Sequence, residues 1–229
     1  MMIFIHSAVK RWSKFLWFLL ALLPLINGNK ALAETPLNPF KHRFYAGIGA
    51  GLGSTTWRGL VPVNDKETAV LTISTPTDVK EGGGTYNLVM GYEFTPYFAL
   101  EGAYQRYPKA RVMFEEDSLF AFEHDDLTSF QSNTDTLSLM AKVMLLVPRS
   151  FVRMYAGFGL ASVHRYDEFN EYFKLSPTFG AGFNWSINER FIVELGFNYT
   201  TGYGESEISP ANHYIPFLYS GMLNVNYRF

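Results

Sequence analysis

The sequence predicts an all-β fold, an eight-stranded antiparallel transmembrane β-barrel with short periplasmic turns and long extracellular loops. Apolar and polar residues alternate with a period of two along most of the chain after residue 43, which gives each segment one apolar face. Most segments have about 9–11 residues, the length that a tilted strand needs to cross a bilayer. The connections alternate between short and long, an asymmetry typical of barrels that span an outer membrane.

The composition excludes several classes of protein. Of 229 residues, 48% are hydrophobic and 17% are charged, so the chain is not intrinsically disordered. The 19 basic and 21 acidic residues form no basic run, which argues against nucleic acid as a partner. The chain has no cysteine, which excludes a disulfide scaffold, a thiolate metal site and a cysteine nucleophile.

The first 33 residues have the pattern of a cleavable signal peptide. Basic residues at positions 10, 11 and 14 precede an apolar run from Phe15 to Ile26. Ala31-Leu32-Ala33 then offers the small residues after which signal peptidase cuts. The apolar run would span only about 18 Å as a helix, too short for a bilayer core of about 30 Å. We therefore expect export across the inner membrane and removal of residues 1–33.

The remaining chain divides into two predicted parts. Residues 34–42 are expected to form a short extended periplasmic lead-in, and residues 43–229 the barrel. This portion carries 15 basic and 21 acidic residues, and no stretch in it approaches 18 apolar residues. No transmembrane helix is therefore expected after cleavage.

Eight alternating segments are the predicted barrel strands: 44–53, 85–94, 98–105, 136–147, 152–161, 178–185, 190–199 and 217–229. Short turns are expected near 95–97, 148–150 and 186–189, and long loops near 54–83, 108–134, 163–176 and 201–215. In lipid, every backbone N–H and C=O needs a protein partner, and a closed sheet supplies one without leaving an edge. A soluble barrel or sandwich would also alternate, but it would not need a tight turn at every second corner.

Charged side chains at inward positions are the candidate site. Four of them lie within the spanning part of their strands: Glu101, Lys142, Arg153 and Glu194. Two positive and two negative groups in a narrow lumen should pair, because an unpaired buried charge is very costly. Three more inward charges lie near the periplasmic end, where we expect water to reach them: Glu93, Arg190 and Arg228. The paired set is either a static plug of the lumen or a gate.

The end of the chain resembles a known family. The alternating Leu223, Val225, Tyr227 and Phe229 resemble the C-terminal strand signal that the barrel-assembly machinery reads in bacterial outer-membrane proteins. Together with the eight segments and the strand 155–160, this resembles the small barrels of the OmpA, OmpX and opacity type. The resemblance implies contact with outer-membrane lipid and lipopolysaccharide, a monomeric state, and a lumen plugged by a Glu/Arg/Lys set that acts as a gate.

The predicted loops carry less specific chemistry. The second long loop holds six acidic residues between aromatic ones: Glu115, Glu116, Asp117, Glu123, Asp125 and Asp126. Their spacing matches no calcium loop, so we expect no metal site and no cofactor. In the first loop, the run 69–74 has β propensity and is expected to extend the sheet as a hairpin, whose edge offers a place for a partner strand.

Three functions remain open at this point. The leading one is an outer-membrane surface protein with a structural or adhesion role, whose loops meet a host or surface ligand. The second is a small gated pore of low conductance. The third is a lipid A-modifying enzyme, which would need a Ser/His/acid set or paired carboxylates at the outer rim. His42 lies near the periplasmic end, and His124, His164 and His213 fall in predicted loops without a serine-proximal motif. We therefore expect no enzymatic activity and assign no catalytic residue.

Overall fold

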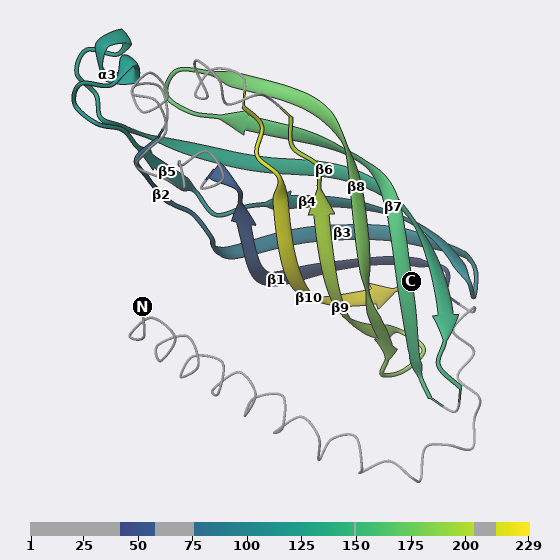
Figure 1. Ribbon diagram of the computed structural model, residues 1–229. Helices are drawn as coiled ribbons and strands as arrows, with labels where there is room; N and C mark the ends of the chain where they lie inside the picture. Colours follow the sequence, from purple (N-terminus) through teal and green to yellow (C-terminus); the bar gives the residue numbers. More distant parts are fainter. Residues whose placement is uncertain (1–41, 58–75, 149, 204–213) are drawn as a thin grey trace, which may run out of the picture. The chain divides into compact units, whose positions relative to one another are not determined.

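The computed structural model describes residues 42–57, 76–148, 150–203 and 214–229 (Figure 1). The predicted signal peptide, the lead-in up to residue 41, the run 69–74 and His213 lie outside the described residues. Among the residues that are described, no helix is long and apolar enough to cross a membrane.

Eight strands form the barrel: β1 (Phe44–Thr55), β3 (Gly83–Thr95), β4 (Phe98–Arg106), β6 (Ser129–Leu146), β7 (Val152–Tyr166), β8 (Glu171–Ser186), β9 (Phe191–Thr200) and β10 (Leu218–Arg228). Each pairs antiparallel with its neighbours, and the ring closes because β1 pairs with both β3 and β10 while β6 pairs with both β4 and β7. The predicted eight-stranded antiparallel barrel is confirmed. Two short strands and one helix lie outside the ring: β2 (Asp78–Lys80), β5 (Ala110–Met113) and α3 (Leu119–Glu123).

The barrel buries polar side chains and exposes apolar ones. On β3, Leu88 and Met90 are 54% and 61% exposed, whereas the alternate residues Asn87 and Glu93 are 3% and 1% exposed. A water-soluble protein would reverse this pattern. The arrangement fits a barrel whose outer face meets lipid and whose narrow lumen is filled by side chains.

Aromatic rings pack around the end of the barrel that carries the short turns. The ring of Phe44 lies 5.6 Å from that of Phe229, and Tyr227 lies 5.1 Å from Phe229 and 5.2 Å from Phe191, between ring centroids. The backbone N–H of Phe229 donates to the carbonyl of Phe44 at 2.9 Å. This aromatic belt therefore also joins the last strand to the first.

Three strands run further than the sequence predicted. β6 begins at Ser129, β7 continues to Tyr166 and β8 begins at Glu171, so the connection expected at 163–176 shrinks to residues 167–170. The expected long third loop was wrong, and His164 lies on β7 rather than in a loop. The reason is that the outward face of β7 becomes polar after Leu160, at Ser162 and His164. A strand that has left the lipid no longer needs an apolar outer face, and that face was the signal used for prediction.

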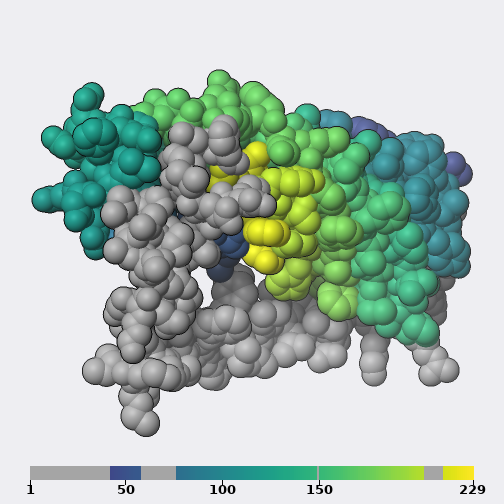
Figure 2. All heavy atoms as spheres, turned by 45° about the horizontal axis from the view of Figure 1, so that its top comes forward, coloured from purple at the N-terminus to yellow at the C-terminus, as the bar shows by residue number. Residues whose placement is uncertain are grey.

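The prolonged strands build what we call the outer lobe, which consists of β2, β5, α3 and the ends of β6, β7 and β8 beyond the barrel. β5 pairs with β6 and β2 pairs with β5, so the sheet widens on one side. The lobe has its own apolar core: Trp57, Val79, Ala110, Val112, Phe114, Phe120, Phe130 and Tyr214. α3 is capped by the Ser118 hydroxyl, which accepts from the N–H of Ala121 at 3.1 Å. In Figure 2 the segment that carries α3 projects at one end of the barrel.

Candidate functional site: a filled lumen beneath a folded lobe

A central charge cluster crosses the lumen at Lys142, on β6. Its ammonium is 2% exposed and donates to Glu101 Oε2 at 2.7 Å and to Glu194 Oε1 and Oε2 at 2.9 and 3.1 Å. Tyr45 donates its hydroxyl to Glu101 Oε2 at 2.8 Å, and Tyr155 donates to Glu194 Oε1 at 3.0 Å. Lys142 Nζ also lies 4.3 Å from the centre of the Tyr155 ring. Every charged group of this cluster is therefore held by another side chain, as buried charges require.

Two inward glycines make this geometry possible. A Cβ added to Gly91 would overlap the ring of Tyr45, and one added to Gly196 would overlap the hydroxyl of Tyr155. Gly91 is the direct cross-strand partner of Tyr45. Each tyrosine can therefore lie across a bare stretch of backbone and reach a carboxylate on another strand.

A second cluster lies toward the short-turn end and is centred on Glu93. Arg153 Nη2 donates to Glu93 Oε1 at 2.6 Å, and Arg228 Nη2 donates to Glu93 Oε1 and Oε2 at 3.2 and 3.3 Å. Glu93 and Arg228 are each 1% exposed. Sequence analysis expected water to reach these two residues, and the structure corrects that expectation.

The predicted network of four charged residues is in fact two clusters. Glu101, Lys142 and Glu194 meet, but Arg153 contacts Glu93 instead. On β7, Arg153 lies four positions from Gly157, the cross-strand partner of Lys142. Four residues span about 13 Å along a strand, so the two positions lie at different levels of the lumen.

Arg190 was also expected to point into the lumen, and this was wrong. It precedes β9, is exposed, and donates from Nη1 to the hydroxyl of Tyr227 at 2.8 Å. The N–H of Arg190 donates to Asn188 Oδ1 at 2.8 Å, so the turn, and not the alternation of β9, sets the direction of this side chain.

The two clusters have opposite charge excess. The central cluster holds two carboxylates and one ammonium, and the cluster around Glu93 holds two guanidinium groups and one carboxylate. The six charges together balance. The net negative charge of the central cluster attracts the net positive charge of the cluster around Glu93. This attraction along the lumen favours the structure in which both clusters are formed.

The lumen above the central cluster is also filled. A polar cavity of about 20 Å³ borders Glu101, Glu194, Asn87 and Asn224, which is room for about one water molecule. Toward the outer end, buried apolar side chains pack together: Tyr107, Val163, Ile215 and Leu218. Among the described residues, side chains thus occupy the lumen at three successive levels.

Arg165 organises the contact between barrel and outer lobe, and sequence analysis missed it. Its side chain is fully buried, donates from Nη1 to the carbonyl of Tyr214 at 2.6 Å, and forms an ion pair with Asp167. The guanidinium lies 4.6 Å from the centre of the Trp57 ring. Burial lowers the pKa of Arg165, and the Asp167 carboxylate beside it acts in the opposite direction. Continuing the alternation past Leu160 would have placed Arg165 inward and marked it as a buried charge.

The acidic second loop is part of the outer lobe, and the two described histidines of the lobe contact residues close to them in the chain. Phe114 and Phe120 stack at 4.3 Å in the lobe core, whereas Phe122 is 86% exposed. His124 Nδ1 lies 2.9 Å from the carbonyl of Phe120, and His164 Nε2 lies 2.8 Å from a carboxylate oxygen of Glu171. Within the described ranges, no group of three or more histidine or acidic side chains is arranged to hold a metal ion. The expectation of no enzymatic activity stays a prediction.

The predicted assembly signal lies on the lipid-facing side of β10 and just beyond its end. Leu223, Val225 and Phe229 are 53%, 48% and 61% exposed, and Tyr227 packs in the aromatic belt. Recognition of these residues by the barrel-assembly machinery stays a prediction.

The closed ring, the apolar outer wall and the charged interior define a small transmembrane β-barrel of the outer-membrane type, with a lumen filled by side chains. The family of the outer membrane protein beta-barrel domain has a model that matches residues 18–229, and the chain belongs to this family. The protein is accordingly located in the outer membrane of a Gram-negative bacterium. No curated protein matches the sequence.

Solved structures of similar fold are small outer-membrane barrels. Neisserial surface protein A (NspA) aligns with a TM-score of 0.50 and 12% identity, covering 81% of this chain and 97% of its own. The outer membrane protein OprG from Pseudomonas aeruginosa also aligns with a TM-score of 0.50 and 12% identity, covering 82% and 96%. The N-terminal barrel domain of OprF from Pseudomonas aeruginosa has a TM-score of 0.46 and 14% identity, covering 82% and 98%. At these identities the likeness concerns the fold alone.

Proposed function

We propose that the protein is a non-conducting outer-membrane anchor that presents the outer lobe as a binding surface outside the cell. The observation that carries this proposal is the filled lumen. Lys142 alone makes three charge-assisted hydrogen bonds, each worth roughly 1.5–3 kcal/mol. Breaking them without new partners would cost on the order of 5 kcal/mol, which leaves about one molecule in several thousand open.

The outer lobe supports the second half of the proposal. It is a folded unit with a hydrophobic core and a buried arginine, not a set of separate loops. A surface that is ordered before binding loses less conformational entropy when a partner arrives. Around α3 the chain presents the six acidic residues between 115 and 126 and the exposed Phe122. This surface would attract a basic partner by charge complementarity.

Planar-bilayer recording of refolded residues 34–229 tests the first half. A heat-dependent shift on an SDS gel would first show that the barrel has closed. We expect a silent bilayer. Discrete openings would overturn the anchor role and favour the alternative, a small gated pore whose gate is the central cluster.

A charge-neutralised lobe tests the second half. Cells that display the wild-type protein are compared with cells that display a variant in which the six acidic residues around α3 become Asn or Gln. The probe is a surface coated with polylysine. We expect weaker attachment of the variant and a loss of the difference at high salt, because salt screens exposed charges. Equal attachment at low salt would contradict the assigned surface.

A further inference from the structure

Two buried amide oxygens converge in the lumen without a hydrogen-bond donor. They are Oδ1 of Asn87 on β3 and Oδ1 of Asn224 on β10, and both residues are 3% exposed. Neither oxygen accepts a hydrogen bond from any residue that the structure describes. Buried polar atoms are almost always hydrogen-bonded, because burial takes away the water that would otherwise bind them. Two such atoms in one place therefore need a partner from outside the chain.

The strand register brings the two oxygens together. Gly49 on β1 is the direct cross-strand partner of Asn87 on one side and of Asn224 on the other. Both oxygens lie within 2.3 Å of the one point that a Cβ of Gly49 would take. Any side chain at this position would collide with them, so the glycine allows the two amides to face the same small space.

Two carboxylates lie beside the amide oxygens. Glu194 is the cross-strand partner of Asn224, whose Nδ2 donates to Glu194 Oε1 at 3.4 Å. Glu101 accepts from Tyr45 and from Lys142, and both of these hydrogen bonds end on Oε2. The other oxygen of Glu101, Oε1, is therefore left without a donor among the described residues.

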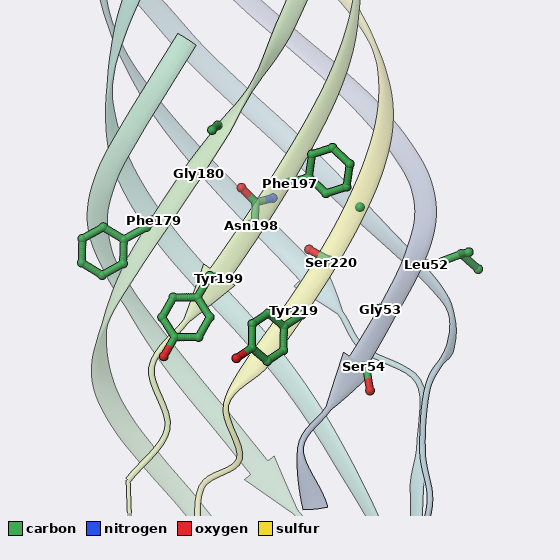
Figure 3. Close-up of a pocket in the computed structure, with 12 residues that line it drawn as sticks. Leu52, Gly53, Ser54, Phe179, Gly180, Phe197, Asn198, Tyr199, Tyr219 and Ser220 are labelled. Carbon is green, nitrogen blue, oxygen red and sulfur yellow. The ribbon is translucent and has the colours of Figure 1, made fainter. Parts of the chain in front are cut away.

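The surroundings of these oxygens are acidic or neutral. A cavity of about 20 Å³ borders both asparagines and both glutamates, and none of the described residues that line it is basic. Asn198 lines the cavity too, and in Figure 3 it lies on β9 between the rings of Phe197 and Tyr199. The polar lining consists of amide, hydroxyl and carboxylate groups. Such a lining favours a positively charged ligand over an anion.

We infer that the lumen holds one sodium ion between Asn87, Asn224 and the two glutamates of the central cluster. Carboxylate and amide oxygens are the ligands of hard cations, and in membrane proteins carbonyl oxygens replace the water shell of a bound monovalent ion. The cavity has room for about one water molecule, and a sodium ion without its water shell is smaller than that. The site lies in the lumen and is independent of the binding surface proposed for the outer lobe. It corrects the expectation of no metal site, which rested on the spacing of acidic residues in the second loop.

The charge of the central cluster favours a monovalent ion over water and over a divalent ion. Glu101, Glu194 and Lys142 together leave one negative charge in excess. A water molecule could serve the two amide oxygens but would leave this excess, whereas one sodium ion neutralises it. A divalent ion would reverse the excess at a buried site. The two guanidinium groups around Glu93 already contact a carboxylate and lie at another level of the lumen.

Urea unfolding of residues 34–229 in phosphatidylcholine vesicles tests the inference, with sodium chloride replaced stepwise by choline chloride at constant total salt. Choline is far too large for this cavity, so it maintains the ionic strength without entering. A ligand that binds only the folded chain raises the folding equilibrium constant in proportion to its concentration once the site is mostly filled. We expect this constant to rise roughly threefold to tenfold between about 50 mM and about 500 mM sodium. Equal stability in both salts would mean that the cavity holds water alone, and would overturn the inference.

Asn87→Ala removes one of the two amide oxygens and should abolish the dependence on sodium. Asn226→Ala is a matched control, because Asn226 is also buried on β10, at 1% exposure, and its Oδ1 accepts no hydrogen bond from a described residue. Asn226 is not among the residues that line the cavity, so this variant should keep the wild-type dependence. The heat-dependent gel shift verifies that each barrel closes, and Asn224→Ala replaces Asn87→Ala if that variant does not close.

Two further results would overturn the inference. An equal dependence on sodium in wild type and in both variants would place the ion elsewhere, such as at the acidic residues around α3. A stability that follows calcium and not sodium would assign a divalent ion to the chain.

Discussion

Replacing Lys142 with methionine should destabilise the barrel by leaving two buried carboxylates without a cation. Glu101 and Glu194 would then face each other across the lumen, both less than 10% exposed. Removing one partner of a buried ion pair typically costs about 3–5 kcal/mol. Each 1.4 kcal/mol is a factor of ten, so the folding equilibrium should fall by roughly a hundredfold to a few thousandfold.

Urea unfolding in lipid vesicles, followed by tryptophan fluorescence, measures this loss. The loss should be smaller at about pH 4 than at about pH 8, because protonation of a carboxylate neutralises it. The control is a triple variant, Lys142→Met with Glu101→Gln and Glu194→Gln, which should recover most of the stability since no charge is left in the central cluster. A Lys142→Met barrel within about 1 kcal/mol of wild type at both pH values would refute the account of the central cluster. Openings in the variant but not in wild type would instead favour the gated pore.

Three further predictions concern the other buried groups. Glu93→Gln should lower the urea midpoint, because its two arginine partners would lose their carboxylate; an unchanged midpoint would mean that water reaches them after all. Arg165→Met should leave the Asp167 carboxylate without its cation and speed hydrogen exchange in β5 and α3, whereas equal acceleration throughout the barrel would contradict a separately folded lobe. Burial raises the pKa of Tyr214, so the stability that this group contributes is complete below about pH 10 and is lost as the pH rises through its raised value. Trp57, whose ring centroid lies 5.0 Å from that of Tyr214, should report this loss by fluorescence, and Tyr214→Phe should remove it.

The class of fold, and the face on which each residue within a barrel strand lies, follow from the alternation of apolar and polar residues. A strand has a period of two, so alternating residues such as Asn87 and Leu88 must point to opposite sides whatever their partners are. Lipid outside and a narrow lumen inside then decide which side is apolar. For the same reason Glu101, Lys142 and Glu194 could be placed inward before any contact was known.

Which inward charges meet, and where the strands end, depend on contacts between residues that are far apart in the chain. Partner choice depends on the register between neighbouring strands, which places Arg153 four strand positions from the partner of Lys142 and next to Glu93. The ends of β6, β7 and β8 depend on packing in the outer lobe, where the lipid no longer dictates an apolar outer face. The buried position of Arg165 depends on Trp57, which follows a different strand far away in the chain. Periodicity is a local property, whereas register and packing join residues that the sequence keeps apart.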